Sequence, residues 1–511
     1  MVSRVKSAGL EGVNGYRIDV EVDVSQGLPS FDIVGLPDTA VRESRERVRA
    51  SIKNCGFDFP ARRITVNMAP ADKKKEGPLY DLPIFIAILA ATEQLRADLR
   101  EYAFIGELSL GGEIRPVRGV LPIVLALRDS GVRHVFLPRE NAAEAGVAGG
   151  IDILPAEHVS QVIDHALGIL PIEPFYADDA VYAQPPEDLL DFADVAGQLM
   201  PKKALETAAA GGHNVLLIGP PGTGKSMLAK RLPSILPDMT FDEALETTKL
   251  YSISGLLSAG RPFVSARPFR SPHHTISYAG MAGGGSTPRP GELSLAHNGV
   301  LFLDELPEYS KSVLEVLRQP LEDGTVHISR VAAAVEYPCS IMLVCAMNPC
   351  KCGFYGHPTK ACRCSQKDID RYIGRVSGPL LDRIDIQVEV PAVSFDDMAQ
   401  REKGEASDAI RRRVCAAREI QIKRYAGTGI TSNARLYGDM LRNCCKLDGE
   451  ATRLLKKIFE TLALSARGYD RILKVARTVA DLKAHQDITA ADVAEAAQYR
   501  ALDKKYFHAR V

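Results

Sequence analysis

The spacing of apolar and polar residues predicts short strands and buried helices in the first third of the chain. Segments Tyr16–Val24 and Arg63–Met68 alternate in polarity or run apolar with β-branched residues, which is typical of strands. Leu82–Leu95 and Leu121–Ser130 are longer apolar runs, and their length favours buried helices. We therefore expect residues 1–168 to form a domain that mixes strands and helices.

The pattern changes twice further along the chain. Residues 169–190 contain four prolines and five acidic residues without any period, so they read as a linker. Residues 191–395 alternate apolar strands with helical patterns, which indicates an α/β domain. Residues 396–511 have almost no strand signal. Their runs of Ala, Leu, Arg and Lys, as in Leu473–Ala484, predict a helical domain.

Composition and charge restrict the class of protein. The 511 residues include 46% apolar and 25% charged residues, the ordinary mix of globular domains. A net charge of −1 excludes a globally basic protein that coats nucleic acid. The charge is nevertheless uneven, because residues 396–511 carry +7 and the rest of the chain −8. This asymmetry suggests a binding partner for the C-terminal part.

Segments for membrane insertion or secretion are not evident. No apolar run reaches the roughly 20 residues that span a bilayer, and the N-terminus lacks the apolar core of a signal peptide. Ten cysteines in a chain of this length do not form a disulfide scaffold. We expect a soluble cytoplasmic protein.

One motif in the α/β region points to nucleotide chemistry. Residues Gly219, Pro220, Pro221, Gly222, Thr223, Gly224, Lys225 and Ser226 fit the pattern GxxxxGK[ST] in full. The motif follows the apolar strand Val215–Ile218 and precedes a helical pattern, which is the context that a phosphate loop requires. Its backbone N–H groups would bind phosphate oxygens, Lys225 would reach the β and γ phosphates, and Ser226 would hold Mg²⁺. We expect ATP and Mg²⁺ as ligands.

Two further strands end in polar residues suited to the same chemistry. Val300–Leu303 is followed by Asp304, a second Mg²⁺ ligand through water, and by Glu305, which could orient or deprotonate the attacking water. The strand Ser340–Ala346 is followed by Asn348, whose amide could hold that water or the γ phosphate. The alternative for Asn348 is a helix-capping residue without chemistry.

Four cysteines lie close together after Asn348. Cys350 and Cys352 form one pair, Cys362 and Cys364 form another, and glycines lie between the pairs. Four thiolates can close a tetrahedral structural Zn²⁺ site, which leaves no open position for catalysis. The alternative is a set of free, reduced thiols.

These residues resemble the core of an AAA+ ATPase, with Walker A at 219–226, Walker B at 300–305 and sensor 1 at Asn348. Nearly the whole chain is similar to the magnesium-chelatase-like family known as YifB or ComM. The stretches that carry this likeness are Ala208–His213, Arg270–His274, Gly291–Ser294 and Ser377–Asp385. The resemblance implies a P-loop AAA+ α/β core at 191–395 and a C-terminal helical lid at 396–511.

The resemblance also implies a ring whose active sites lie between subunits. Arg383 is similar to the arginine finger that acts on the neighbouring subunit's γ phosphate. Arg467 is similar to sensor 2, with Arg471 as the alternative. The segment between Walker A and Walker B resembles a helix-2 insert. Residues Thr325–Tyr337 resemble a pre-sensor-1 hairpin, with Arg330 near its tip as a DNA contact; the alternative is a hairpin that only supports the subunit interface.

Residues 1–168 resemble the Lon-protease-like (S5 domain 2-like) α+β fold. Ile105–Leu110 and Gly131–Asn141 carry this likeness. Leu79 stands where Lon has its nucleophilic serine, and Leu121 falls near the position of the partner lysine. Leucine supplies neither a hydroxyl nor an amine, so we expect no peptidase activity.

The function implied by the resemblance is that of a homohexameric, Mg²⁺-dependent ATPase that moves DNA through its ring. Such a helicase would promote branch migration of single-stranded and branched DNA in natural transformation. One alternative is the ATPase motor subunit of a magnesium chelatase, although that type of subunit lacks both the Lon-like domain and the cysteine cluster. The other is a protein-remodelling chaperone, although such rings usually present an aromatic pore residue rather than Arg330.

Overall fold

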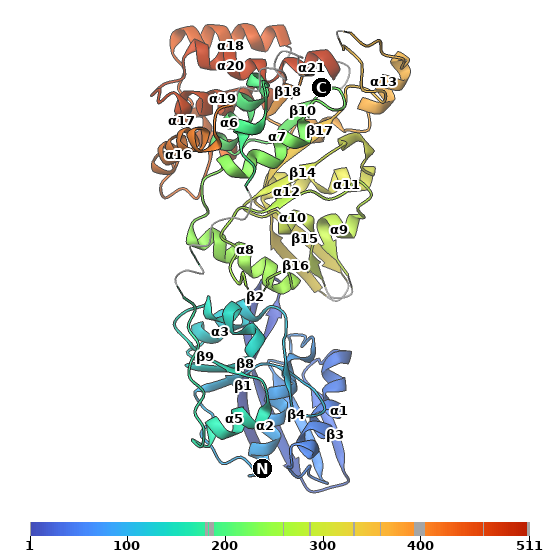
Figure 1. Ribbon diagram of the computed structural model, residues 1–511, viewed down its shortest axis with the longest axis vertical. Helices are drawn as coiled ribbons and strands as arrows, with labels where there is room; N and C mark the ends of the chain where they lie inside the picture. Colours follow the sequence, from blue (N-terminus) through green and yellow to red (C-terminus); the bar gives the residue numbers. More distant parts are fainter. Residues whose placement is uncertain are drawn as a thin grey trace. The chain divides into compact units, whose positions relative to one another are not determined.

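The computed structural model describes residues 2–178, 182, 189–258, 260–285, 288–330, 333–357, 359–392, 404–462 and 464–507. The chain divides into two compact units (Figure 1). One unit comprises Met1–Pro185 with Phe241–Ser265, and the other comprises Pro186–Thr240 with Ala266–Val511. Residues 241–265 thus pack with the N-terminal part, although the sequence places them inside the predicted ATPase core. Much of the predicted linker and the predicted boundary at 395 lie outside the described residues. The limits of the three predicted domains and of the linker stay predictions.

A seven-stranded mixed sheet forms the centre of the first unit, in the order β3-β4-β2-β1-β5-β8-β9. Its strands are β1 (Val2–Glu11), β2 (Asn14–Ser25), β3 (Ser30–Val34), β4 (Arg63–Ala69), β5 (Tyr102–Phe104), β8 (His134–Pro138) and β9 (Asp152–Ala156). Every second residue of β2 from Ile18 to Val24 is buried, as expected for a strand with one face in the core. The predicted strands at 16–24 and 63–68 are therefore confirmed.

The helices of this unit include two that the sequence predicts. They are α1 (Thr39–Asn54), α2 (Asp81–Ala91), α3 (Val120–Asp129), α4 (Ala142–Gly146), α5 (Val159–Ala166) and α8 (Phe241–Ser254), with a small pair of strands, β6 (Glu107–Leu108) and β7 (Ile114–Arg115). Every residue of α2 except Ala90 is buried, because the helix is apolar almost throughout. Helix α8 is joined to the start of α3, since the Ser252 carbonyl accepts from Gly119 N–H at 3.2 Å.

A five-stranded sheet organises the second unit, in the order β11-β14-β17-β10-β18. The strands are β10 (Val215–Ile218), β11 (Phe269–Arg270), β14 (Val300–Leu303), β17 (Met342–Met347) and β18 (Ile386–Glu389), and all neighbours are parallel. Every residue of β10, β14 and β17 is buried. Continuous apolar runs of this kind are typical of a parallel sheet with both faces covered, so the predicted α/β class is confirmed here.

Helices and two small hairpins surround this sheet (Figure 1). The helices before residue 404 are α6 (Leu199–Gly211), α7 (Lys225–Arg231), α9 (Tyr278–Ala282), α10 (Glu292–Leu295), α11 (Lys311–Val316), α12 (Arg318–Asp323), α13 (Gln366–Ile373) and α14 (Gly378–Leu381). The hairpins pair β12 (Gly283–Gly284) with β13 (Arg289–Pro290), and β15 (Thr325–Arg330) with β16 (Ala333–Pro338).

The C-terminal part is helical, as the sequence predicts. Its helices are α16 (Ser407–Arg424), α17 (Gly438–Cys444), α18 (Gly449–Leu462), α19 (Ala466–Leu482), α20 (Ala490–Gln498) and α21 (Ala501–Tyr506). One hydrophobic core joins α16, α17, α18, α19 and α20 to α6 and the parallel sheet, through residues such as Ala208, Val414 and Val479. None of the helices in the described part of the chain is long and apolar enough to cross a bilayer.

Candidate functional site

Parallel strands bring the predicted nucleotide-binding residues to one edge of the sheet. Strand β17 lies between β10 and β14, and Ile218 at the end of β10 pairs with Met347 at the end of β17. The carboxyl ends of parallel strands meet at a common edge, where open α/β sheets bind their ligands. The loop 219–226, Asp304 and Asn348 follow these strands and therefore converge there.

Glycines allow the loop 219–226 to turn back on the sheet. Gly222 and Gly224 have φ values of 78° and 86°, in the left-handed region that side chains disfavour. A Cβ on Gly219 would lie 2.2 Å from the carbonyl oxygen of Val390. Helix α7 begins within this motif, at Lys225. The motif thus has the strand–loop–helix structure that the sequence predicts.

The Lys225 amine lies inside this loop. Its Nζ donates to the carbonyl oxygens of Gly219 at 2.8 Å and Pro220 at 2.7 Å, and to Asn348 Oδ1 at 3.1 Å. Thr223 Oγ1 also donates to the Pro220 carbonyl, at 3.0 Å. Burial lowers the pKa of Lys225 to about 8, although nearby carboxylates oppose this change. The side chain of Asn348, the predicted sensor 1, is therefore in direct contact with the lysine of the phosphate loop.

Ser226 and Asp304 form the oxygen-rich part of the site. Ser226 Oγ donates to Asp304 Oδ2 at 2.5 Å, and the backbone N–H of Glu305 donates to Asp304 Oδ1 at 2.9 Å. Hydroxyl and carboxylate oxygens are the ligands that Mg²⁺ prefers. The donor set at the end of the loop therefore fits Mg²⁺.

Glu305 contacts a histidine that the sequence analysis did not assign to this site. Glu305 has a φ of 53°, a left-handed conformation that is uncommon without glycine and often marks a functional position. His274 Nδ1 lies 3.4 Å from Glu305 Oε2, and the rings of His273 and His274 are 4.1 Å apart. The position of His274 shortly after an edge strand beside β14 is the signal that could have identified it.

Contacts with Glu292 and Tyr309 fix the segment that carries His274. Arg270 pairs with Glu292 through two contacts of 2.7 Å, which joins the end of β11 to α10. The hydroxyl of Tyr309, close to Walker B, donates to the Pro272 carbonyl at 2.6 Å. The chain directly before His274 is thus held by two contacts.

Arg383 is engaged within its own chain. Its Nε donates to the Arg318 carbonyl at 2.8 Å and its Nη1 to the Pro379 carbonyl at 2.6 Å. Its Nη2 forms an ion pair with Glu322 at 2.6 Å. Action on a neighbouring subunit would require at least the pair with Glu322 to open, and the finger assignment stays a prediction.

The two candidate sensor 2 residues differ in their surroundings. Arg467 is exposed, with Nη1 4.0 Å from Asp382 Oδ2. Arg471 is nearly buried, with contacts of 3.3 Å to Asp382 and 3.8 Å to Asp385. Both candidates therefore lie beside the stretch that contains Arg383, and Arg471 is the more firmly held.

A buried polar network explains why the stretch Ala208–His213 ends in Gly-Gly-His. His213 Nδ1 lies 3.0 Å from Asp385 Oδ2, and Nε2 lies 2.8 Å from Thr478 Oγ1. Burial alone raises the pKa of Asp385, but the hydrogen bond with His213 and the nearby basic side chains of Lys474 and Arg471 together hold the pKa below its usual value. A Cβ on Gly211 would lie 2.2 Å from His213 Nε2. The histidine thus links α6, the strand β18 region and helix α19.

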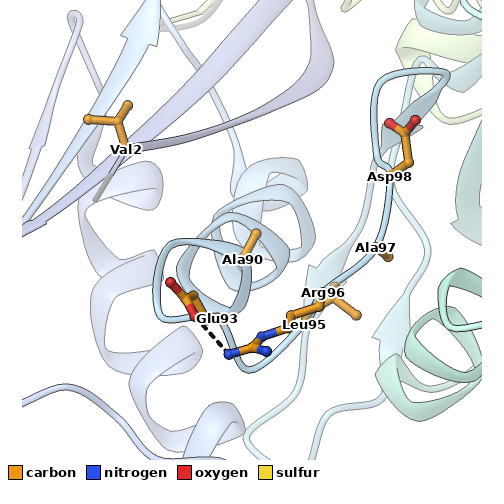
Figure 2. A pocket seen from close by; sticks show the side chains of 7 residues that line it. All are labelled: Val2, Ala90, Glu93, Leu95, Arg96, Ala97 and Asp98. Carbon is orange, nitrogen blue, oxygen red and sulfur yellow. Dashed lines mark hydrogen bonds and ion pairs between the residues drawn. The ribbon is translucent and has the colours of Figure 1, made fainter.

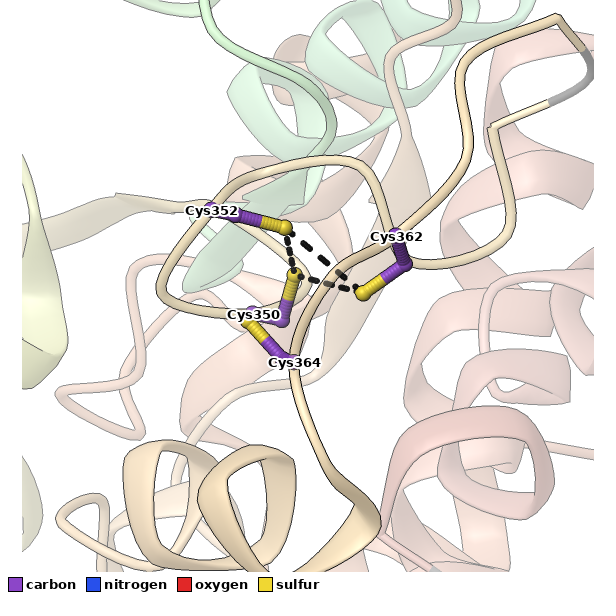
Figure 3. Close-up of side chains that lie close together, drawn as sticks. All are labelled: Cys350, Cys352, Cys362 and Cys364. Atoms are coloured by element: carbon purple, nitrogen blue, oxygen red, sulfur yellow. Dashed lines mark hydrogen bonds between the residues drawn. The ribbon is translucent and has the colours of Figure 1, made fainter.

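The four clustered cysteines converge, as Figure 3 shows. The Sγ of Cys350 lies 3.4 Å from that of Cys352 and 3.7 Å from that of Cys362, and all four Sγ atoms lie within 4.8 Å of one another. Four Zn–S bonds of about 2.3 Å in a tetrahedron place the sulfurs about 3.8 Å apart. All four thiols are free. The cluster therefore fits a tetrahedral metal site.

The two strands predicted for the hairpin that would contact DNA are present in the structure. Strands β15 and β16 are antiparallel, with Thr325 opposite Pro338 and Arg330 opposite Ala333. The turn at 331 and 332 and the side chain of Arg330 lie outside the described residues. The direction of that side chain and its role in DNA binding stay predictions.

Apolar side chains occupy the two positions at which the sequence suggests a lost protease dyad. Leu79 is 6% exposed and Leu121 is fully buried. The N–H of Leu121 donates to Oε1 of Glu144 at 3.0 Å, and the Ser252 hydroxyl donates to the same oxygen. Burial raises the pKa of Glu144 even though these groups oppose it. These contacts fix the start of α3, and they do not position a nucleophilic group.

A groove of about 630 Å³ lies elsewhere on the N-terminal unit (Figure 2). Its lining consists of Val2, Ala90, Glu93, Leu95, Arg96, Ala97 and Asp98. Arg96 pairs with Glu93 at 2.8 Å, and none of these lining residues is a predicted site residue. This groove has no set of converging groups comparable to the nucleotide site.

Comparisons with known proteins cover most of the chain. Three family models match the chain. The model described as magnesium chelatase, subunit ChlI, matches residues 191–398. The model of subunit ChlI of Mg-chelatase matches residues 20–141, and the model of the ChlI C-terminal region matches residues 404–500. The uncharacterized protein YifB of Escherichia coli K12 is 45% identical over 509 residues, 99% of this chain and 98% of that protein. Competence protein ComM of Haemophilus influenzae is 44% identical over 98% of this chain and 97% of its own length. Lon protease of Mycolicibacterium smegmatis is 28% identical over 30% of this chain and 21% of its own.

Proposed function

Because the chain belongs to the magnesium-chelatase-like family that includes YifB and ComM, we propose that it is a Mg²⁺-dependent AAA+ ATPase that moves DNA through a homohexameric ring. The convergence of Lys225, Asn348, Ser226 and Asp304 at one sheet edge carries the ATPase part of this proposal. The family by itself supports an ATPase, and the named relative ComM supports a role in competence.

Each residue of the site has a role in ATP hydrolysis. The loop 219–224 binds phosphate oxygens through its N–H groups, and Lys225 contacts the β and γ phosphates. Ser226 and Asp304 would hold Mg²⁺, which neutralises phosphate charge when it is bound. Glu305 orients the attacking water and takes its proton, while Asn348 holds the γ phosphate or that water.

The assembly and the DNA path follow from the family. Arg383 would complete the neighbouring subunit's site, with Arg467 or Arg471 as sensor 2 in the C-terminal helical lid. Arg330 would contact the phosphates of single-stranded or branched DNA inside the ring, without reading bases. Such a motor in the cytoplasm would promote branch migration during natural transformation.

The cysteine cluster would hold a structural Zn²⁺. Four thiolates at these separations satisfy the metal and leave it no open position, so the metal would stabilise the loop rather than take part in hydrolysis. The Lon-like N-terminal domain would serve assembly or DNA binding, because Leu79 and Leu121 cannot form a Ser–Lys dyad.

ATPase activity with single-stranded, duplex and branched DNA tests the proposal. We expect DNA to stimulate hydrolysis, and Lys225→Ala to abolish both basal and stimulated activity by removing phosphate binding. Hydrolysis that no DNA stimulates would favour the chelatase motor or the protein-remodelling chaperone. The absence of any ATPase activity in folded protein would contradict the proposal as a whole.

A further inference from the structure

The loop that carries the four cysteines packs directly against the phosphate loop. A Cβ on Gly353 would lie 2.5 Å from Cδ and 3.1 Å from Cγ of Pro221. Gly353 has a φ of 81°, and its N–H donates to the Cys350 carbonyl at 2.9 Å. Glycine is therefore required here both by the turn and by the close approach to Pro221.

Both ends of the cysteine loop also meet the nucleotide site at Asn348. Cys350 follows Asn348 by two residues, and the Asn348 side chain accepts from Lys225 Nζ at 3.1 Å. Tyr372, which lies on helix α13 after the loop, is hydrogen bonded to the backbone of Asn348. A shift of the cysteine loop would thus reach Lys225 through Asn348 as well as through Pro221.

The loop has little packing of its own to hold it in this position. Among its described residues from 350 to 364, only Cys350 and Gly353 are buried. A loop without an apolar core depends on its metal for a defined structure. Metal binding by Cys350 and Cys352, which precede Gly353 in the chain, and by Cys362 and Cys364, which follow it, would fix the turn at Gly353.

We propose that the metal held by the four cysteines positions the phosphate loop through the contact of Gly353 with Pro221, so that nucleotide affinity depends on the metal. This inference rests on the proposed ATP site and adds that the metal influences nucleotide binding there. The cysteine loop would act as a brace for the phosphate loop, in addition to stabilising its own fold.

Metal removal tests the dependence directly. Reduced full-length protein should contain about one Zn²⁺ per chain. Chelation under reducing conditions, with far-UV circular dichroism to verify that the chain stays folded, should weaken binding of a fluorescent ADP about tenfold, and added Zn²⁺ should restore it. Equal affinity with and without metal would overturn the inference. Failure of the metal-loaded chain to bind nucleotide would instead contradict the proposed ATPase.

Two glycine variants separate the brace from general loop damage. Gly353→Ala introduces the clash with Pro221, whereas Gly356→Ala is a matched control. Gly356 has a φ of 74°, and a Cβ there would meet its nearest atoms only at 3.9 Å. Both variants share the backbone strain and should keep the metal. Gly353→Ala should weaken ADP binding about tenfold and raise hydrogen exchange at 219–226, whereas Gly356→Ala should change neither by more than about twofold. Equal effects of the two variants would contradict the inference.

Discussion

Ser226 and Asp304 are hydrogen bonded at 2.5 Å although 78 residues separate them in the chain. Ser226 lies in the first turn of α7, and Asp304 follows β14, which is separated from β10 by β17. The contact exists because these parallel strands end at one edge of the sheet. It places a hydroxyl and a carboxylate where the phosphate loop ends.

Glu305 should be needed for hydrolysis but not for binding. Its carboxylate is the proposed base, and an amide cannot accept the proton of the attacking water. Glu305→Gln should therefore bind ATP with near-normal affinity and hydrolyse it at least about 100-fold more slowly. Nucleotide titration and single-turnover hydrolysis measure the two properties separately, and a variant with normal turnover would remove Glu305 from this role.

Nucleotide affinity should fall as the pH rises through about 8. Burial lowers the pKa of Lys225 to about 8 in the free protein, so the amine loses its proton above that pH. Phosphate binding needs the ammonium, and binding must then recover a proton from solution. The affinity for Mg²⁺-ADP should be nearly constant below pH 7 and fall by up to about tenfold per pH unit above 8.

Lys225→Arg is the control for this pH dependence. A guanidinium keeps its charge throughout the range, so the affinity of this variant should not follow the same slope, even where it is weaker overall. Titrations from pH 6.5 to 9.5 at constant Mg²⁺ and ionic strength measure both proteins. A parallel slope in the two would show that another group titrates.

His274 should position Glu305 for hydrolysis. The histidine contacts the Glu305 carboxylate at 3.4 Å, whereas the neighbouring His273 contacts Thr275 Oγ1 at 2.9 Å. His274→Ala should lower kcat about tenfold with little change in KM, because misplacement affects the catalytic group and not the phosphate loop. His273→Ala is the matched control and should retain a kcat within about twofold of the parent. Equal losses would indicate a structural effect on the whole segment.

Arg383 should act on the neighbouring subunit's ATP. Mixtures of Arg383→Ala and Glu305→Gln subunits should recover part of the ATPase activity, because some interfaces then contain both intact residues. The pair of Arg383 with Glu322 at 2.6 Å must open for this, so Glu322→Gln should leave activity intact or raise it. Mixtures that are no more active than either variant alone would contradict the prediction that Arg383 acts on the neighbouring subunit.

DNA binding should depend on Arg330 and on salt. The net charge of −1 means that DNA contacts must be local. Arg330→Ala should weaken DNA binding and flatten the slope of log affinity against log salt, because fewer counterions are released. Basal ATPase activity should change little.

An exposed arginine elsewhere supplies the comparison for Arg330. The side chain of Arg442 on α17 is 82% exposed, so Arg442→Ala removes one charge without altering the hairpin. DNA affinity across a salt series should be unchanged in this variant. The same loss in both variants would point to general charge rather than to the hairpin.

Local sequence patterns predicted several of the elements, because periodicity and turn chemistry are properties of short segments. The strand at 215–218, the loop 219–226 and the paired strands at 325–338 are confirmed at nearly the predicted positions. The four-cysteine cluster was also predicted, since its members lie within 15 residues of one another.

Contacts between distant segments could be decided only by the tertiary structure. The sequence placed residues 241–265 with the ATPase core, yet their helix packs with the N-terminal unit, because burial depends on partners that no local pattern specifies. The pairs of His274 with Glu305 and of Gly353 with Pro221 likewise join segments that are remote in the chain. The sequence by itself therefore determined which chemical groups the protein carries and in which local structure. The packing of the sheet and its loops decided which of those groups meet, because long-range contacts depend on the shape of the whole unit.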